Sequence, residues 1–225
     1  MHKAIVAASV IMWAWLGSGM PMPVHASEGP APSAIGSIDA QGADVMPSQE
    51  RQFKTLYSNF RRDKTARWTF EGLGVSGPEH PDGRQFIAFP FEVRYDSILR
   101  RVELALLWIQ GPNAFTVSLR ADAAGVPGDV LHTFQSTDAP PADPPCCAFF
   151  KAATAGVPLS AGTIYWIVAK ADGASAGEWD FNNIGDIAPY AWKQEGGDWT
   201  PGGIGARGAM RLLGTKQADG NASPD

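Results

Sequence analysis

Two tryptophans flank a polar segment with the sequence WKQEGGDW. If Gly196 and Gly197 are the two central residues of a hairpin turn, Gln194 pairs with Trp199, and Trp192 becomes a diagonal neighbour of Trp199 on the same face. Apolar ring faces in this arrangement can stack on the C–H faces of a sugar ring, but aromatic side chains also cap the ends of sandwich cores. The pair therefore predicts either a polysaccharide platform or a structural cap.

A run of side-chain oxygens begins at Asp180, in the segment EWDFNN. Its start is like that of a calcium loop, but Ile184 and Ala191 occupy the fifth and twelfth positions, where an EF-hand needs an oxygen ligand and a Glu. A polar turn after Trp179 is therefore favoured, and we predict no metal site. Trp179, Asp180 and Asn182 are candidate ligand contacts beside the tryptophan pair.

The segment GASAG matches the G-x-S-x-G pattern of a nucleophile elbow around Ser175. That motif needs a helix after the Ser and a His later in the chain. The following residues, EWDFNN, are not helical in character, and both His80 and His132 come before Ser175. We therefore predict no catalytic site and no cofactor. Glycosidase carboxylates can come from distant strands, so a glycan-active enzyme stays open as a third function class.

Cys146 and Cys147 are the two cysteines of the sequence, and they are adjacent. In an oxidising compartment they could form a vicinal disulfide, although adjacent Cα atoms lie about 3.8 Å apart, closer than in ordinary disulfides. The alternatives are two buried thiols or a bond to a second chain.

The ends of the 225-residue sequence differ in composition from its middle. Residues 1–26 have a basic start, an apolar run and a Val-x-Ala site, which predicts a secretory signal peptide; the run is shorter than the roughly 20 residues that cross a bilayer. Residues 27–50 predict a flexible linker and 215–225 a disordered tail, leaving 51–214 as a single domain. No membrane span is expected after signal cleavage.

The formal net charge of −5 argues against a nucleic-acid partner.

Most of the middle region alternates between apolar and polar residues, as strands do. The expected strands and turns lie at 85–93, 98–108, 115–120, 130–134, 163–169, 190–200 and 209–213. Pro90 suggests an edge strand or a bend, and 163–169 is apolar on both faces, as a central strand is. The only segment with helical character is 50–58. The expected fold is an all-β antiparallel sandwich, jelly-roll-like, in a single domain.

The segment ADAAGVPGDVL predicts a tight turn between two strands. Pro127 presets φ, Gly125 and Gly128 permit positive φ, and Asp122 can accept main-chain N–H bonds across the loop. A calcium ligand is the alternative role for Asp122, but few other oxygens lie nearby in the sequence.

Several segments together resemble the choice-of-anchor type of bacterial surface-protein domain, which is often associated with PEP-CTERM anchors. The most specific are D-x-x-G-x-P-G-x-x-L, from Asp122 to Leu131, and L-x-A-G-T-x-Y-W, from Leu159 to Trp166. The resemblance covers roughly 55–214 and implies a secreted β-sandwich without established catalysis. The sequence shows no C-terminal anchor motif, which favours a released, extracellular or periplasmic protein.

Two function classes lead. The first is a non-catalytic extracellular module with a structural or adhesive role, and the second is a carbohydrate-binding protein that recognises a polysaccharide through surface Trp residues. A polysaccharide or a cell-surface component is accordingly the expected partner.

Overall fold

The computed structural model describes residues 53–60, 68–80, 85–134, 138–142 and 149–217, all within one compact unit, residues 43–225. The described residues form thirteen β-strands and no helix. Consequently, they include no helix that could cross a membrane. The strands are β1 (Lys54–Ser58), β2 (Trp68–Ser76), β3 (Phe86–Glu92), β4 (Ser97–Leu104), β5 (Leu106–Gln110), β6 (Phe115–Asp122), β7 (Pro127–Phe134), β8 (Phe150–Leu159), β9 (Ile164–Ala171), β10 (Ala176–Asn182), β11 (Ile187–Lys193), β12 (Thr200–Ala206) and β13 (Met210–Lys216).

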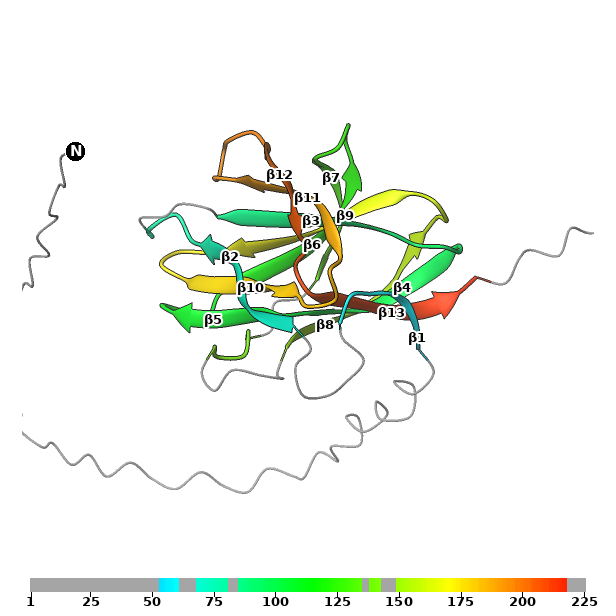
Figure 1. The fold of residues 1–225 in the computed structure, drawn as a ribbon, viewed down its shortest axis with the longest axis horizontal. Coiled ribbons are helices and arrows are strands. Elements are labelled where there is room, and N and C mark those ends of the chain that lie inside the picture. The colour runs from blue at the N-terminus through cyan, green and yellow to red at the C-terminus, as the bar shows by residue number, and fades with distance from the viewer. Residues whose placement is uncertain (1–52, 61–67, 81–84, 135–137, 143–148, 218–225) are drawn as a thin grey trace, which may run out of the picture. The chain divides into compact units, whose positions relative to one another are not determined.

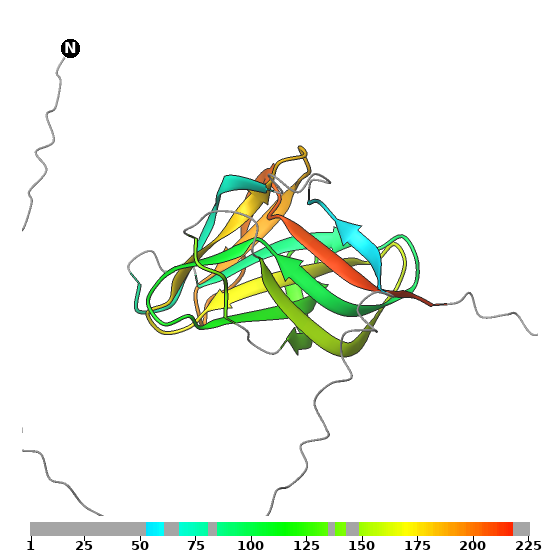
Figure 2. The same cartoon turned by 90° about the horizontal axis from the view of Figure 1, so that it is seen from below.

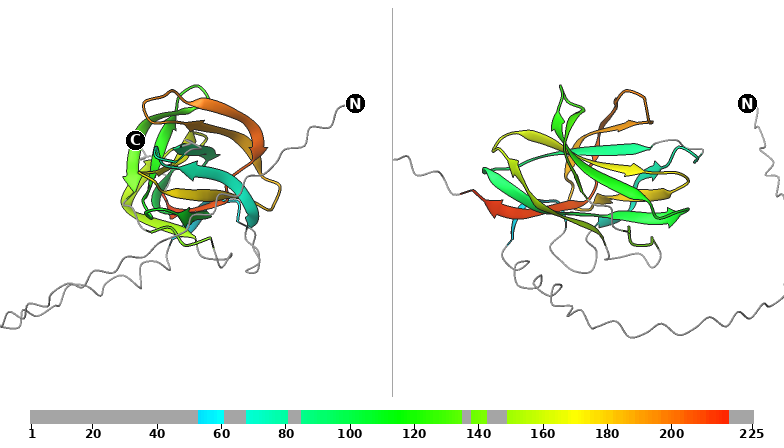
Figure 3. Two further views of the ribbon diagram at one scale, coloured as in Figure 1. Left: turned by 90° about the vertical axis from the view of Figure 1, so that its left-hand side faces the viewer. Right: turned by 180° about the vertical axis from the view of Figure 1, so that it is seen from behind.

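The strands make three antiparallel sheets. Their orders are β1-β13-β4-β8, β2-β10-β5 and β12-β11-β3-β9-β6-β7. Figures 1 and 2 show the six-stranded sheet packed over the other two, with strands far apart in the sequence lying side by side, such as β1 and β13. The predicted all-β antiparallel sandwich is thus confirmed. Figure 3 shows the β11–β12 hairpin at one edge of the six-stranded sheet and β7 at the other.

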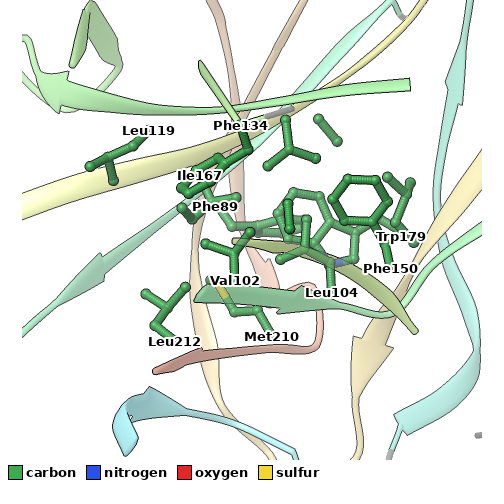
Figure 4. Packing of buried hydrophobic residues seen from close by; sticks show 14 of the residues in the cluster. Phe89, Val102, Leu104, Leu119, Phe134, Phe150, Ile167, Trp179, Met210 and Leu212 are labelled. Carbon is green, nitrogen blue, oxygen red and sulfur yellow. The ribbon is translucent and has the colours of Figure 1, made fainter. Parts of the chain in front are cut away.

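The main core lies between the two layers. In β9, for example, Tyr165, Ile167, Ala169 and Ala171 point into this core, because the side-chain period of a strand is two. Figure 4 shows how side chains from both layers meet; Phe89 and Ile167 come from the six-stranded sheet, and Val102, Met210 and Trp179 come from the opposite layer. β9 is buried on both faces, as its two-sided apolar sequence predicted.

Three expectations about local structure need correction. Residues 54–58 of the segment with helical character form β1, because β1 pairs with β13 at the far end of the chain and tertiary pairing overrides local propensity. The strand expected at 98–108 is two strands, which separate at Ala105 as the chain passes from the four-stranded to the three-stranded sheet. β13 also continues to Lys216, two residues into the segment 215–225 that was predicted as a tail.

Candidate functional site

Two prolines end the pairing between β3 and β11. The two strands pair only at Phe86–Ala88 and Ala191–Lys193, with Ala191 opposite Ala88. Continuing this register by two residues along each strand would place Pro189 opposite Pro90, and both prolines line the space that opens there. Neither proline has a main-chain N–H, so the ladder cannot continue there. Of the two alternatives that Pro90 suggested, an edge strand or a bend, the edge strand is wrong, because β3 lies inside the sheet. The Pro90 end of β3 nevertheless lacks a partner on the β11 side.

A cleft of about 480 Å³ opens where the two strands separate. This volume lies in the range typical of small-ligand sites, about 300–1,000 Å³. Its floor and walls come from five strands, the β6–β7 turn and the residues after β3 and β12. The lining residues are Tyr57, Pro90, Phe91, Glu92, Arg94, Asp122, Gly125, Ile164, Trp166, Pro189 and Arg207.

One wall of the cleft is a hydrogen-bonded cluster around Asp186. The Tyr57 hydroxyl donates to Asp186 Oδ2 at 2.6 Å, and Asn59 Nδ2 donates to the same oxygen at 3.1 Å. Arg207 Nη1 lies 3.4 Å from it and also donates to the Tyr57 hydroxyl. The guanidinium also lies 5.4 Å from the centroid of the Tyr57 ring. These contacts fix the Tyr57 and Arg207 side chains before any ligand arrives.

Burial and the hydrogen bond to Asp186 raise the pKa of Tyr57 well above its ordinary value near 10. Burial disfavours the charged phenolate because it removes solvating water, and the hydrogen bond disfavours it because ionisation would remove the proton that the hydroxyl donates to the Asp186 carboxylate. The nearby Arg207 opposes the shift without cancelling it.

We expect Tyr57→Phe to change how stability depends on alkaline pH. Because the folded-state pKa is raised, the unfolded chain loses this proton first, so the contribution of Tyr57 is complete below pH about 10 and is lost as the pH rises further. At neutral pH the variant should be less stable by about 1.5 kcal/mol, the value of a hydrogen bond to a charged group. Urea unfolding should show this gap narrowing above pH about 10.

Tyr95, which is 55% exposed, provides the control. Tyr95→Phe should match the wild type in stability at neutral pH to within about 0.5 kcal/mol, as for most surface substitutions. Parallel profiles for the wild type and Tyr57→Phe over the alkaline range would contradict the assigned hydrogen bond.

Asn182 holds the loop that carries Asp186. Its Oδ1 accepts from the N–H groups of Ile184 (3.2 Å) and Asp186 (2.9 Å), and its Nδ2 donates to the carbonyls of Asp186 (2.6 Å) and Arg207 (2.8 Å). The oxygen-rich run thus forms a polar turn. Across the described residues, no three His, Cys, Asp or Glu side chains are grouped so as to hold a metal ion.

Trp179, Asp180 and Asn182 do not form a ligand surface, contrary to the prediction. Trp179 is fully buried, and its Nε1 donates to the carbonyl of Ala209 at 3.1 Å. Asp180 and Asn182 are also buried. All three residues lie on β10, the middle strand of the three-stranded sheet, and their burial keeps a ligand in solvent from reaching them.

The opposite wall of the cleft is built on the turn after β6. Asp122 Oδ1 accepts from Trp166 Nε1 at 2.8 Å, and Oδ2 accepts from the N–H of Gly125 at 3.2 Å. Gly125 has φ +86°, and Asp122 pairs with Pro127 where β7 begins. Gly128 follows in β7, and its carbonyl accepts from Arg120 Nη1 at 3.1 Å. The turn therefore anchors the indole of Trp166 at the cleft floor.

The predicted tryptophan platform does not form, because the hairpin register differs by one residue. The connection runs from Gln194 to Trp199, with Gly197 N–H donating to the Gln194 carbonyl at 3.2 Å, and Trp192 pairs with Thr200. A one-residue shift turns a side chain to the opposite face. Trp192 accordingly packs against the main core, whereas Trp199 packs against the outer face of the six-stranded sheet.

Trp199 covers a small apolar cluster on that outer face. The buried members are Phe86, Ala88, Trp166, Val168 and Ala191. The Phe86 and Trp199 rings meet edge to face at 6.1 Å, and Lys193 Nζ lies 5.4 Å from the Trp199 centroid. Trp199 thus acts as a cap on a second core, with Lys193 covering its ring.

Two other sequence motifs do not enter the cleft. Ser175 is fully buried in the turn before β10 and donates its hydroxyl to the Pro112 carbonyl at 2.5 Å, so the G-x-S-x-G segment presents no exposed nucleophile. Cys146 and Cys147 lie outside the described residues, and their vicinal disulfide stays a prediction.

The comparisons with known proteins assign no relatives: no family model, curated protein or solved structure matches the chain.

Proposed function

We propose that this domain is an exported, non-catalytic recognition module with an adhesive or structural role, and that its ligand binds in the cleft between β3 and β11. The observation that carries the proposal is the cleft itself: it opens where the pairing of β3 and β11 ends before Pro90 and Pro189, and the Asp186 cluster holds Tyr57 and Arg207 rigid at one wall. A site whose side chains are fixed in advance loses less conformational entropy on binding.

The chemistry of the lining suits recognition of a partner with both polar and apolar groups. Pro90, Ile164 and Pro189 supply apolar surface, while Glu92 and Arg207 supply opposite charges. Small-ligand sites commonly combine a mostly apolar wall with a few fixed polar groups. The choice-of-anchor resemblance and the signal-like residues 1–26 support export to the cell surface or the medium.

We assign the carboxylate of Asp122 a structural role rather than a catalytic one. Asp122 and Glu92 flank Ile164 on neighbouring strands, which places two carboxylates at the cleft. Both oxygens of Asp122 already accept hydrogen bonds, from Trp166 and from Gly125. Those two bonds support the proposal of binding without glycoside hydrolysis.

A polysaccharide remains the alternative ligand, but it would bind in the cleft. Trp192 and Trp199 face opposite sides of the sheet and cannot stack on one sugar chain together. A carbohydrate would instead contact the apolar floor around Ile164 and the charged groups at the walls.

We expect Ile164→Arg to abolish ligand binding while the fold stays intact. Ile164 is 47% exposed and lines the cleft, so a long charged side chain at this position would fill it. The stability change should stay within about 0.5 kcal/mol, as for most surface substitutions. Retention of the labelled protein on a glycan array and on whole bacterial cells measures the effect.

Leu131→Arg is the matched control, because Leu131 is 45% exposed on β7 of the same sheet and does not line the cleft. It adds the same charge and should bind like the wild type. Equal losses in the two variants, or equal retention, would contradict the proposed site.

A further inference from the structure

The end of β3 has an open main-chain edge inside the cleft. From Pro90 to Glu92 the strand pairs with β9 on one side, at Trp166, Tyr165 and Ile164. On the other side its pairing with β11 has already ended at Ala88. Within the described residues, this stretch therefore has a strand neighbour on one side only.

The facing edge of β11 is open as well. From Ile187 to Pro189 this strand pairs with β12 at Ala206, Gly205 and Ile204, and not with β3. Alternate residues of a strand direct their main-chain N–H and C=O groups toward the same side. Both strands thus turn unpaired main-chain groups toward the cleft, although Pro90 and Pro189 can offer only carbonyls.

We propose that the cleft binds an extended peptide segment of a partner protein, which adds to the open edge of β3 as a further strand. This inference rests on the proposed function, since it names the ligand class of the same cleft. A peptide main chain repeats its donors and acceptors with the spacing of the open edge, and strand addition derives its affinity from that match. A sugar chain has no such repeat.

The side chains around the edge indicate what the segment should carry. Side chains on one face of the added strand would lie beside Glu92, and those on the other face beside the rings of Phe91 and Tyr57, whose centroids are 6.0 Å apart. Opposite charges and aromatic–apolar pairs are favourable between neighbouring strands. Because Arg94 also lines the cleft, two residues after Glu92, we expect charged residues on the first face of the segment and apolar residues on the second.

A library of random short peptides displayed on phage, selected on the full chain, tests the proposal. The peptides recovered should alternate charged and apolar residues. They should bind the wild type and Leu131→Arg, but not Ile164→Arg. The tightest peptide is then resynthesised with each main-chain N–H methylated in turn. Methylation at every second position should weaken binding by about tenfold, because each methyl group at those positions removes one main-chain hydrogen bond. Methylation at the intervening positions should have little effect.

The outcomes separate this inference from the proposed function. Failure to select any peptide that depends on the cleft, or a methylation scan without alternation, overturns strand addition. A glycan that binds the wild type and not Ile164→Arg would also overturn it, while supporting the cleft as the ligand site. If neither peptide nor glycan distinguishes Ile164→Arg from Leu131→Arg, the proposed function fails as well.

Discussion

Replacing Trp179 by alanine should lower the free energy of unfolding by about 3–5 kcal/mol, the range for a large aromatic removed from a core. Its ring packs edge to face against Phe89, with centroids 5.0 Å apart. Its Nε1 donates to the Ala209 carbonyl, so truncation also leaves a buried acceptor without its donor. Since small domains are stable by about 5–15 kcal/mol, the loss is a large share of the total.

Urea unfolding measures this loss, and Trp199→Ala is the comparison. Trp199 is partly exposed and caps only the outer cluster, so its removal should cost about 1–2 kcal/mol. A Trp179→Ala protein that keeps wild-type stability but no longer binds the ligand would contradict this account and support Trp179 as a ligand contact.

Glu103→Ala should destabilise the protein by about 3 kcal/mol, the lower end of the range for breaking a buried ion pair. Glu103 lies on β4, is 1% exposed, and is directly opposite Arg211 on β13 and Lys151 on β8. Arg211 binds its carboxylate through two nitrogens, and Arg101 Nε lies 3.2 Å from Oε1. Without the carboxylate, the positive charges of Arg101, Lys151 and Arg211 would lie together on one sheet face and repel one another. The low end applies because Arg211 is 30% exposed and water screens it.

Thermal and urea unfolding of Glu103→Ala, compared with Glu71→Ala, tests this assignment. Glu71 is exposed, so its removal should change stability by no more than about 0.5 kcal/mol. Similar stabilities for the two variants would show that the protein tolerates the three cations without the Glu103 carboxylate, and would contradict the prediction.

Much of the fold could be predicted from local patterns. The alternation in residues 115–120 and the two-sided apolar run at 163–169 identify β6 and β9, because burial on one or both faces of a strand leaves a direct trace in the sequence. β1 could not be found this way, since its pairing with β13 lies far along the chain.

The candidate site was harder to predict, because it depends on register between distant strands. Gly196 and Gly197 allow two placements of the turn, and a difference of one residue decides which face Trp199 takes. Likewise, Pro90 and Pro189 are visible in the sequence, but only the pairing of Ala88 with Ala191 brings them opposite each other and opens the cleft. Arg207 and Tyr57 reach it from other elements.

A nuclear magnetic resonance titration of the isotope-labelled protein tests the central claim most directly. The titrant is the tightest binder from the peptide library or the glycan array. We predict that the largest chemical-shift changes occur at the amides of Phe91, Glu92 and Ile164 and at the Trp166 indole N–H, all at the cleft. Shifts confined to Trp199 and Lys193, or to the smaller hollow of about 360 Å³ beside His80 and Gln110, would contradict a ligand site between β3 and β11.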